Sequence, residues 1–252
     1  KNEVEKVLYA FLQRAFEEAE EAGAEVVILD IDTPGGFVDT AGDIGKLMDD
    51  TPLTTIAFIN NDALSAGAFI ALHADEIYMV PSGRIGAAAV IDGAGNTAED
   101  KAVSAWSTAM ITAAESSNRN PEYALAMADK SVDLPEYRAP EGKLLTLSAN
   151  EALKVGYSEG TVASFEELIT KLDLSEAKVT SLNETFAEKV ARFVTNPIIV
   201  PILLSIASLG LIVELYSPGF GVAGTMGLSA LGLFFFGHLV AGLAGYESII
   251  LF

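Results

Sequence analysis

The sequence contains no cysteine and only two histidines among its 252 residues. The absence of cysteine excludes disulfides, thiolate zinc sites and cysteine nucleophiles. His238 stands inside a long apolar stretch, where a catalytic base is not expected. His73 follows Ser65 by eight residues, and a helix at 1.5 Å per residue would separate the two by about 12 Å. A Ser-His-Asp triad is therefore not expected, and we expect neither a metal nor a cofactor.

Positive charge is also scarce, and the charged residues are unevenly placed. All 15 lysine and arginine residues and 33 of the 35 acidic residues precede position 193. The last 60 residues carry only Glu214 and Glu247. Such an acidic leading region repels phosphate backbones and anionic headgroups, which argues against nucleic-acid binding and against charge-driven attachment to a membrane surface. The nearly uncharged remainder is typical of a segment that lies in lipid.

Two uncharged apolar stretches in this remainder are long enough to cross a bilayer. We predict transmembrane helices near 197–216 and 222–245, joined by a tight turn at Ser217-Pro218-Gly219. The glycine and alanine content of the second stretch suits close helix packing in lipid. The sequence therefore predicts a membrane domain over 186–252, with at least two transmembrane helices, after a leading domain over 1–185.

The leading domain alternates strand-like apolar runs with amphipathic helical patterns. The predicted strands cover 26–31, 54–59, 76–80, 84–91, 161–163 and 178–182, and the predicted helices cover 3–21, 38–47, 97–116, 121–130, 148–156 and 165–172, together with one that follows Ser65. Repeated strand-turn-helix units predict an α/β domain with a mostly parallel sheet. The small residues of 84–91 favour an edge strand that lines a groove for an extended peptide.

Ser65 stands at the junction of a predicted strand and a predicted helix. A polar turn at 60–62 precedes it, and small residues surround it in Ala63-Leu64-Ser65-Ala66-Gly67. Small neighbours allow a sharp strand-to-helix turn that exposes the hydroxyl at a helix N-terminus. This is the layout of a nucleophile elbow, although Ala63 replaces the first glycine of Gly-x-Ser-x-Gly. The alternative is that Ser65 only caps the helix.

A second turn, Pro34-Gly35-Gly36, follows the preceding predicted strand. Strand-to-helix turns of a parallel sheet gather at one edge, so this turn is expected to face Ser65. Adjacent glycines let backbone N–H groups approach a ligand, and together with the N–H of Ala66 they could form an oxyanion hole. The alternative is that the glycines only make a tight turn.

A serine nucleophile needs a base, and lysine can replace histidine if burial leaves it neutral. Lys101 is the candidate, because it follows the groove-like segment and begins a helix that continues with Trp106 and Met110. For this role its pKa would have to lie well below about 10.4. The alternative is an ordinary surface lysine beside Glu99 and Asp100.

These motifs together resemble one family of proteins. Asp32-Thr33-Pro34-Gly35-Gly36, the pentapeptide 63–67, Ile85-Gly86-Ala87 and a lysine-bearing helix followed by Glu115 and Arg119 are similar to the ClpP-class membrane-bound serine proteases called NfeD-like proteins. The resemblance extends over the whole chain. It implies a ClpP/crotonase-like fold, a Ser-Lys dyad of Ser65 and Lys101, and an oxyanion hole at Gly36 and Ala66, with Gly35 shaping the turn.

The resemblance also implies a function. It suggests a membrane-anchored serine endopeptidase that cleaves apolar segments of membrane-associated proteins, forms a homo-oligomer and is linked to a stomatin- or flotillin-like membrane protein. The expected location is the cell membrane, with several spans and the protease domain outside the cytoplasm. The family usually carries a C-terminal OB-like domain, which we do not expect within this chain. The alternatives are a crotonase-like acyl-CoA enzyme and a catalytically silent membrane scaffold or binding module.

Overall fold

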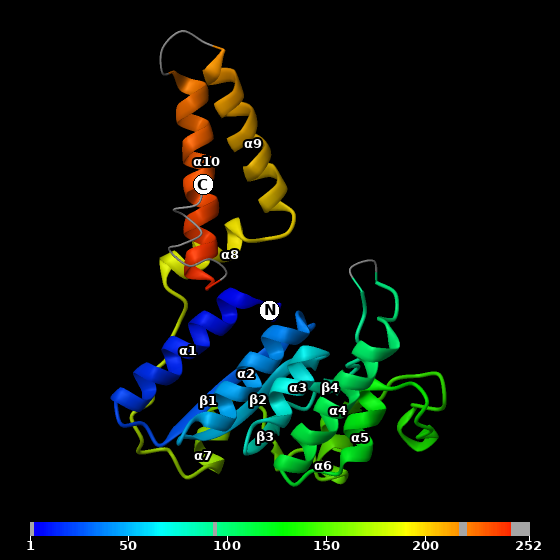
Figure 1. Ribbon diagram of the computed structural model, residues 1–252. Coiled ribbons are helices and arrows are strands. Elements are labelled where there is room, and N and C mark those ends of the chain that lie inside the picture. The colour runs from blue at the N-terminus through cyan, green and yellow to red at the C-terminus, as the bar shows by residue number, and fades with distance from the viewer. Residues whose placement is uncertain (1–2, 93–94, 217–220, 243–252) are drawn as a thin grey trace. The chain divides into compact units, whose positions relative to one another are not determined.

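The computed structural model describes residues 3–92, 95–216 and 221–242, and the chain divides into two units (Figure 1). The first, called here the α/β unit, comprises Lys1–Glu5 and Phe16–Thr180. The second, the helical unit, comprises Lys6–Ala15 and Ser181–Phe252. The predicted assignment of 1–185 to a protease domain and 186–252 to a membrane domain stays a prediction.

A six-stranded sheet forms the centre of the α/β unit. Its strands are β1 (Val26–Thr33), β2 (Thr54–Leu64), β3 (Glu76–Met79), β4 (Arg84–Gly86), β5 (Thr146–Ser148) and β6 (Gly160–Thr161). Their order is β5-β4-β2-β3-β6, and β1 also pairs with β2. All these pairs are parallel except β4–β5. The mostly parallel α/β arrangement that the sequence predicts is confirmed.

Helices precede, connect and follow these strands, and the first of them begins in the helical unit and ends in the α/β unit. They are α1 (Lys6–Glu21), α2 (Val38–Asp50), α3 (Ala66–Leu72), α4 (Asp100–Ser116), α5 (Pro121–Ala128), α6 (Ala149–Lys154) and α7 (Phe165–Lys171), with a 3₁₀ turn, η1, at Pro135–Tyr137. Ser148 and Glu151 cap the start of α6 reciprocally, as the Ser-x-x-Glu spacing indicates. The predicted helices are thus confirmed within a few residues at their ends.

Strand β2 does not stop where the sequence suggests. The predicted polar turn at 60–62 is wrong, because the strand continues to Leu64. Each polar side chain finds a partner on an adjacent strand: Asn60 with Asp30, Asn61 with Asp32, and Asp62 with Arg84. Polar groups that are paired across a sheet do not need water, so the strand can carry them. The extension brings Ser65 directly to the end of a strand.

Two other strand predictions need correction. The segment 84–91 is not an edge strand, because only Arg84–Gly86 is extended and it lies between β2 and β5. Positive φ values at Gly86 (135°) and Ala87 (49°) end it. The segment 178–182 forms no strand; Val179 is 51% exposed, and no strand pairs with this part of the described chain.

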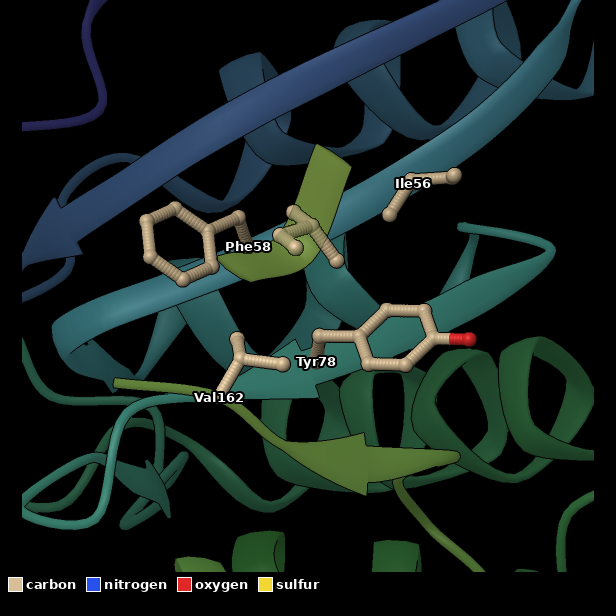
Figure 2. Packing of buried hydrophobic residues seen from close by; sticks show 5 residues of the cluster. Ile56, Phe58, Tyr78 and Val162 are labelled. Atoms are coloured by element: carbon tan, nitrogen blue, oxygen red, sulfur yellow. The ribbon is translucent and has the colours of Figure 1, made fainter. Parts of the chain in front are cut away.

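One hydrophobic core cluster contains side chains from β2, from β3 and from the residue that follows β6, which is the strand paired with β3. Figure 2 shows Ile56 and Phe58 beside Tyr78 and Val162, and Leu168 of α7 completes the cluster. All five side chains are at least nine-tenths buried. Burial also raises the pKa of Tyr78 to about 12, with a further contribution from its hydrogen bond to Glu76.

The helical unit contains α8 (Phe186–Val194), α9 (Ile199–Leu215) and α10 (Val222–Val240). Helix α10 is long and apolar enough to cross a membrane. Helices α8 and α9 pass the same test only together, and they are bent by 80° at the break between them. The predicted turn at 217–219 and the end of the second predicted span, 243–245, lie outside the described residues.

Candidate active site

Ser65 has a backbone conformation that few residues other than glycine adopt. It lies between β2 and α3 with φ 54° and ψ −122°. Its N–H donates to the carbonyl oxygen of Gly86 at 2.9 Å, which holds the strained residue in place. The hydroxyl makes no capping hydrogen bond to α3. Helix capping therefore does not account for this serine, and the sharp turn leaves its hydroxyl available for chemistry.

The Gly35-Gly36 turn faces Ser65, as the parallel sheet predicts. A Cβ atom on Gly35 would lie 2.5 Å from Ser65 Cβ and 2.9 Å from Ser65 Oγ. The φ of Gly35 is 118°, which also favours glycine. Thr33 Oγ1 accepts a hydrogen bond from the Gly35 N–H at 3.1 Å and fixes the turn. Any side chain at position 35 would displace the serine hydroxyl.

A segment near the start of the chain holds this turn from its other side. The Val4 N–H donates to the Gly35 carbonyl at 2.8 Å, and the Phe37 N–H donates to the Val4 carbonyl at 2.8 Å. A Cβ atom on Gly36 would lie 2.1 Å from the Val4 carbonyl oxygen, so glycine is required there for close backbone approach. This contact cannot be predicted from the sequence, because nothing local to Val4 indicates it.

Two backbone amides beside Ser65 remain open. In extended backbone successive N–H groups point to opposite sides, so the Gly36 N–H points away from Val4. It has no hydrogen-bond acceptor within the described part of the chain, and neither does the N–H of Ala66 in the first turn of α3. Gly36 follows Gly35, which lies against Ser65, and Ala66 follows Ser65 directly. Open amides in such a place are suited to an oxyanion.

Lys101 lies in the first turn of α4, and the structure does not pair it with Ser65. Its side chain is exposed, and it has no hydrogen-bond or ion-pair partner among residues 3–92, 95–216 and 221–242. Further along α4, Trp106 and Met110 are buried, as expected. Burial of Lys101 itself is not found in the single chain. The Ser65–Lys101 dyad therefore stays a prediction.

Arg119 is a buried residue to which the sequence alone assigned no role. It is 4% exposed and lies in the loop after α4. Its guanidinium donates to the carbonyls of Ala74 at 3.0 Å, Leu72 at 3.5 Å and Tyr157 at 3.1 Å. Burial lowers the pKa of Arg119. A cation at these carbonyls stabilises the C-terminal end of α3, the helix whose first residue follows Ser65.

His73 is also at the far end of α3, and its Nδ1 lies 2.8 Å from a carboxylate oxygen of Asp49. This histidine is therefore engaged away from Ser65. Among the described residues, no group of three or more histidine, aspartate or glutamate side chains could hold a metal ion.

The fold and the serine turn define a class: an α/β domain that presents a strained serine beside a glycine turn, followed by apolar helices. The chain belongs to the NfeD1b family, because residues 1–182 match the family model for the NfeD1b N-terminal domain. Residues 198–252 match the NfeD integral membrane domain. The predicted family is confirmed, and the protein is a membrane protein.

Two curated relatives are similar over nearly all of this chain. The membrane protein NfeD1b of Bacillus subtilis (strain 168) is 55% identical over 249 residues, which cover 99% of this chain and 57% of the relative. The membrane-bound protease PH1510 of Pyrococcus horikoshii is 27% identical over 259 residues, which cover 96% of this chain and 59% of the relative. The chain thus spans less than two thirds of the length of either relative.

Solved structures of a 1510-N membrane-bound stomatin-specific protease share the fold. A lysine-to-alanine variant in complex with a substrate peptide has a TM-score of 0.63 and 24% identity, and it covers 77% of this chain and 94% of its own. A serine-to-alanine variant has a TM-score of 0.58 and 25% identity, and it covers 73% and 89%. These likenesses confirm the predicted fold class, an α/β domain with a mostly parallel sheet.

Proposed function

We propose that the chain carries a membrane-anchored serine endopeptidase with Ser65 as its nucleophile. The observation that carries the proposal is the strained Ser65 backbone against the Gly35 turn, with open amides at Gly36 and Ala66. The strain presents the hydroxyl at the end of β2, and the two amides would stabilise the negative charge that develops on the substrate oxygen. The relationship to a membrane-bound protease, PH1510, supports the reaction class.

In the proposed reaction, Ser65 Oγ attacks the carbonyl carbon of a peptide bond while Lys101 Nζ, in its neutral form, takes the hydroxyl proton. The carbonyl oxygen becomes an oxyanion that accepts hydrogen bonds from the Gly36 and Ala66 N–H groups. Lys101 then gives the proton to the departing amine, and the peptide bond breaks. Water, deprotonated by the same lysine, hydrolyses the ester on Ser65 and restores the enzyme.

The base needs an environment that the single chain does not provide. Lys101 is exposed, and a lysine becomes neutral near pH 7 only where water is excluded. We propose that bound substrate, or a neighbouring copy in the homo-oligomer, covers Lys101 before the reaction. The dyad would then assemble in the oligomer or in the substrate complex, which limits hydrolysis by a single free chain.

The proposed substrate is an apolar, extended segment of a membrane-associated protein. The relatives of known structure are described as specific for stomatin, which favours a stomatin- or flotillin-like partner here. The membrane domain would hold the enzyme beside such a substrate. We propose that α9 and α10 both cross the membrane, as a hairpin, and that the α/β unit lies outside the cytoplasm.

A serine-reactive fluorophosphonate probe tests the nucleophile directly. The intact protein in detergent should be labelled at Ser65, as located by mass spectrometry of the labelled peptide. Ser65→Ala should abolish labelling, whereas Ser82→Ala, which removes an exposed serine in another turn, should leave it unchanged. Labelling that survives in Ser65→Ala would remove Ser65 from the mechanism. No labelling of the folded wild type would favour the scaffold over the protease.

A further inference from the structure

Helix α8 lies between the two family matches, and neither of them assigns it a role. Two phenylalanines stand on its outer side, Phe186 with 83% and Phe193 with 63% of its surface exposed. They are seven residues apart, which is two helical turns, so both lie on the same face. Two large aromatic side chains on one exposed helix face indicate a contact with a protein partner or with lipid.

The opposite face of α8 is already occupied by the helical unit itself. Ala191 is fully buried in a cluster with Val7 and Ala241. Arg14 donates two hydrogen bonds of 2.9 Å to the carboxylate of Glu188. Helix α8 is therefore fixed on one side, and its orientation cannot change to hide the phenylalanines.

A close contact places α8 at one end of the helical hairpin. A Cβ atom on Gly237 would lie 2.1 Å from Val194 Cγ2, so the end of α8 packs directly on the last turn of α10. Helix α9 begins at Ile199, five residues beyond the end of α8. The C-terminal ends of α8 and α10 therefore lie close together, and α9 begins only a few residues further along the chain.

The bend between α8 and α9 is 80°. If α9 crosses the bilayer, a helix at nearly a right angle to it runs along the membrane surface. Tilt and depth of such a helix are set by its aromatic and basic anchors. Lys189, three residues after Phe186, is exposed on the phenylalanine side, where its long stem can lie along apolar surface while the ammonium group stays in water.

We propose that α8 is an interfacial helix whose Phe186 and Phe193 side chains are embedded in the boundary between headgroups and acyl chains of the bilayer. The occupant of this face is lipid rather than protein, because α8 is joined through the short segment 195–198 to α9, which is proposed to span the membrane. Attraction comes from the apolar rings, since Lys189 is the one basic side chain on this face. Binding is therefore insensitive to anionic lipid. The proposal rests on the proposed spanning of α9.

The cysteine-free chain permits a clean test by single-cysteine labelling. The full chain is reconstituted in phosphatidylcholine vesicles, with and without phosphatidylglycerol, and carries a fluorescent label at Phe193→Cys or Phe186→Cys. Matched controls are Leu209→Cys, an outward position of α9 that is 63% exposed, and Val179→Cys, 51% exposed in the α/β unit. Labels at 186 and 193 should be quenched by shallow spin-labelled lipids. Their access to a water-soluble quencher should be several-fold lower than at 179, in both lipid mixtures.

The controls separate failure of the interfacial helix from failure of the hairpin. Lipid quenching at 209 together with full water access at 193 would overturn the interfacial helix and keep the spanning α9. Water access at 209 would overturn the proposed spanning and the interfacial helix with it. Protection of 193 from water without quenching by lipid would show a protein contact on this face, which also contradicts the proposal. Circular dichroism of each variant checks that the exposed substitutions preserve the fold.

Discussion

The two units bury opposite kinds of side chain. In the α/β unit the interior contains large apolar residues such as Ile56, Phe58 and Leu72. In α9 and α10 the buried residues are small: Ala207, Gly224, Gly227, Ala230 and Gly237. Large side chains there point outward, and Leu215 is 84% exposed. Water drives large apolar groups inward, whereas lipid accepts them and leaves close backbone contact to hold helices together.

Glycine serves both units, with different purposes. In the α/β unit, Gly35 and Gly36 allow a turn to touch Ser65 and the Val4 backbone. In the helical unit, a Cβ atom on Gly210 would lie 2.6 Å from the Ala223 carbonyl oxygen, so glycine allows two helices to touch. Thus glycine shapes a candidate active site in one unit and a helix-helix contact in the other.

The two units also provide different hydrogen-bond donors for their buried or partly buried carboxylates. In the α/β unit, Asp62 accepts two hydrogen bonds from Arg84. The described hairpin helices have no lysine or arginine, and Glu214 instead accepts from the Gly221 N–H at 2.5 Å and the Gly224 N–H at 2.7 Å. The carboxylate caps the N-terminus of α10, where the helix dipole favours negative charge.

The largest expected effect is on catalysis, and it should distinguish a serine of the α/β unit from a serine of the helical unit. Ser65→Ala should lower peptide hydrolysis at least about 10³-fold, because the nucleophile is lost. Ser205→Ala should change nothing, since that hydroxyl donates to the Pro201 carbonyl within α9. Turnover of a fluorogenic peptide by the intact protein in detergent measures both. Comparable losses in the two variants would contradict a catalytic role specific to the α/β unit.

Lys101 offers a sharper test of the same site. Lys101→Arg should be as inactive as Lys101→Ala, because a guanidinium keeps its proton and cannot act as a base. The initial rate at several pH values measures this, and the wild-type rate should rise with pH to a plateau. Substantial activity in Lys101→Arg would exclude Lys101, and Lys130 would be the next lysine to test.

The same substitution should have unequal effects on stability in the two units. Leu168→Ala removes a fully buried side chain from the cluster of Figure 2 and should destabilise the α/β unit by about 2–5 kcal/mol. Leu209→Ala removes an outward side chain of α9 and should cost less than about 0.5 kcal/mol. Calorimetry in detergent measures the two transitions. Equal shifts would mean that Leu209 faces protein rather than lipid or detergent.

A glycine pair tests close packing in the hairpin. Gly210→Ala places a methyl group against the backbone of α10 and should destabilise the α9–α10 contact by about 1–3 kcal/mol. Gly232→Ala, in α10, meets nothing within 4 Å among the described residues and serves as the matched control. Thermal unfolding of the helical unit by circular dichroism distinguishes them. If both variants unfold like the wild type, the helices are not in close contact.

The smallest effect is an acid sensitivity shared by both units. Arg138 lowers the pKa of Glu151 to about 2, and Arg14 lowers the pKa of Glu188. Because the folded pKa is depressed, each glutamate stabilises the fold above its unfolded pKa of about 4.3 and loses this contribution as pH falls. For Glu151 the loss is complete only below about pH 2, where the folded state is protonated as well. The melting-temperature difference between wild type and Glu151→Gln should therefore shrink as pH falls from 7 to 3, and a constant difference would refute the shift.

Local pattern was sufficient for much of this protein. Apolar runs predicted β1 and β3, helical periods predicted α1 and α4, and charge distribution marked off the apolar helices. The meeting of the Gly35 turn with Ser65 was also predictable, because turns at the same end of parallel strands must share an edge. These features depend on residues close in sequence or on a general rule of sheet geometry.

The tertiary structure alone decided which distant groups meet. It paired the polar residues of β2 across the sheet, placed β4 between two strands, brought Val4 to the glycine turn and directed Arg119 to the end of α3. It also left Lys101 exposed, where the sequence led us to expect burial. Periodicity along a chain reports that a face is covered, but the partner that covers it can be a hundred residues away. A residue's burial and hydrogen bonds are therefore set by packing, which no local pattern contains.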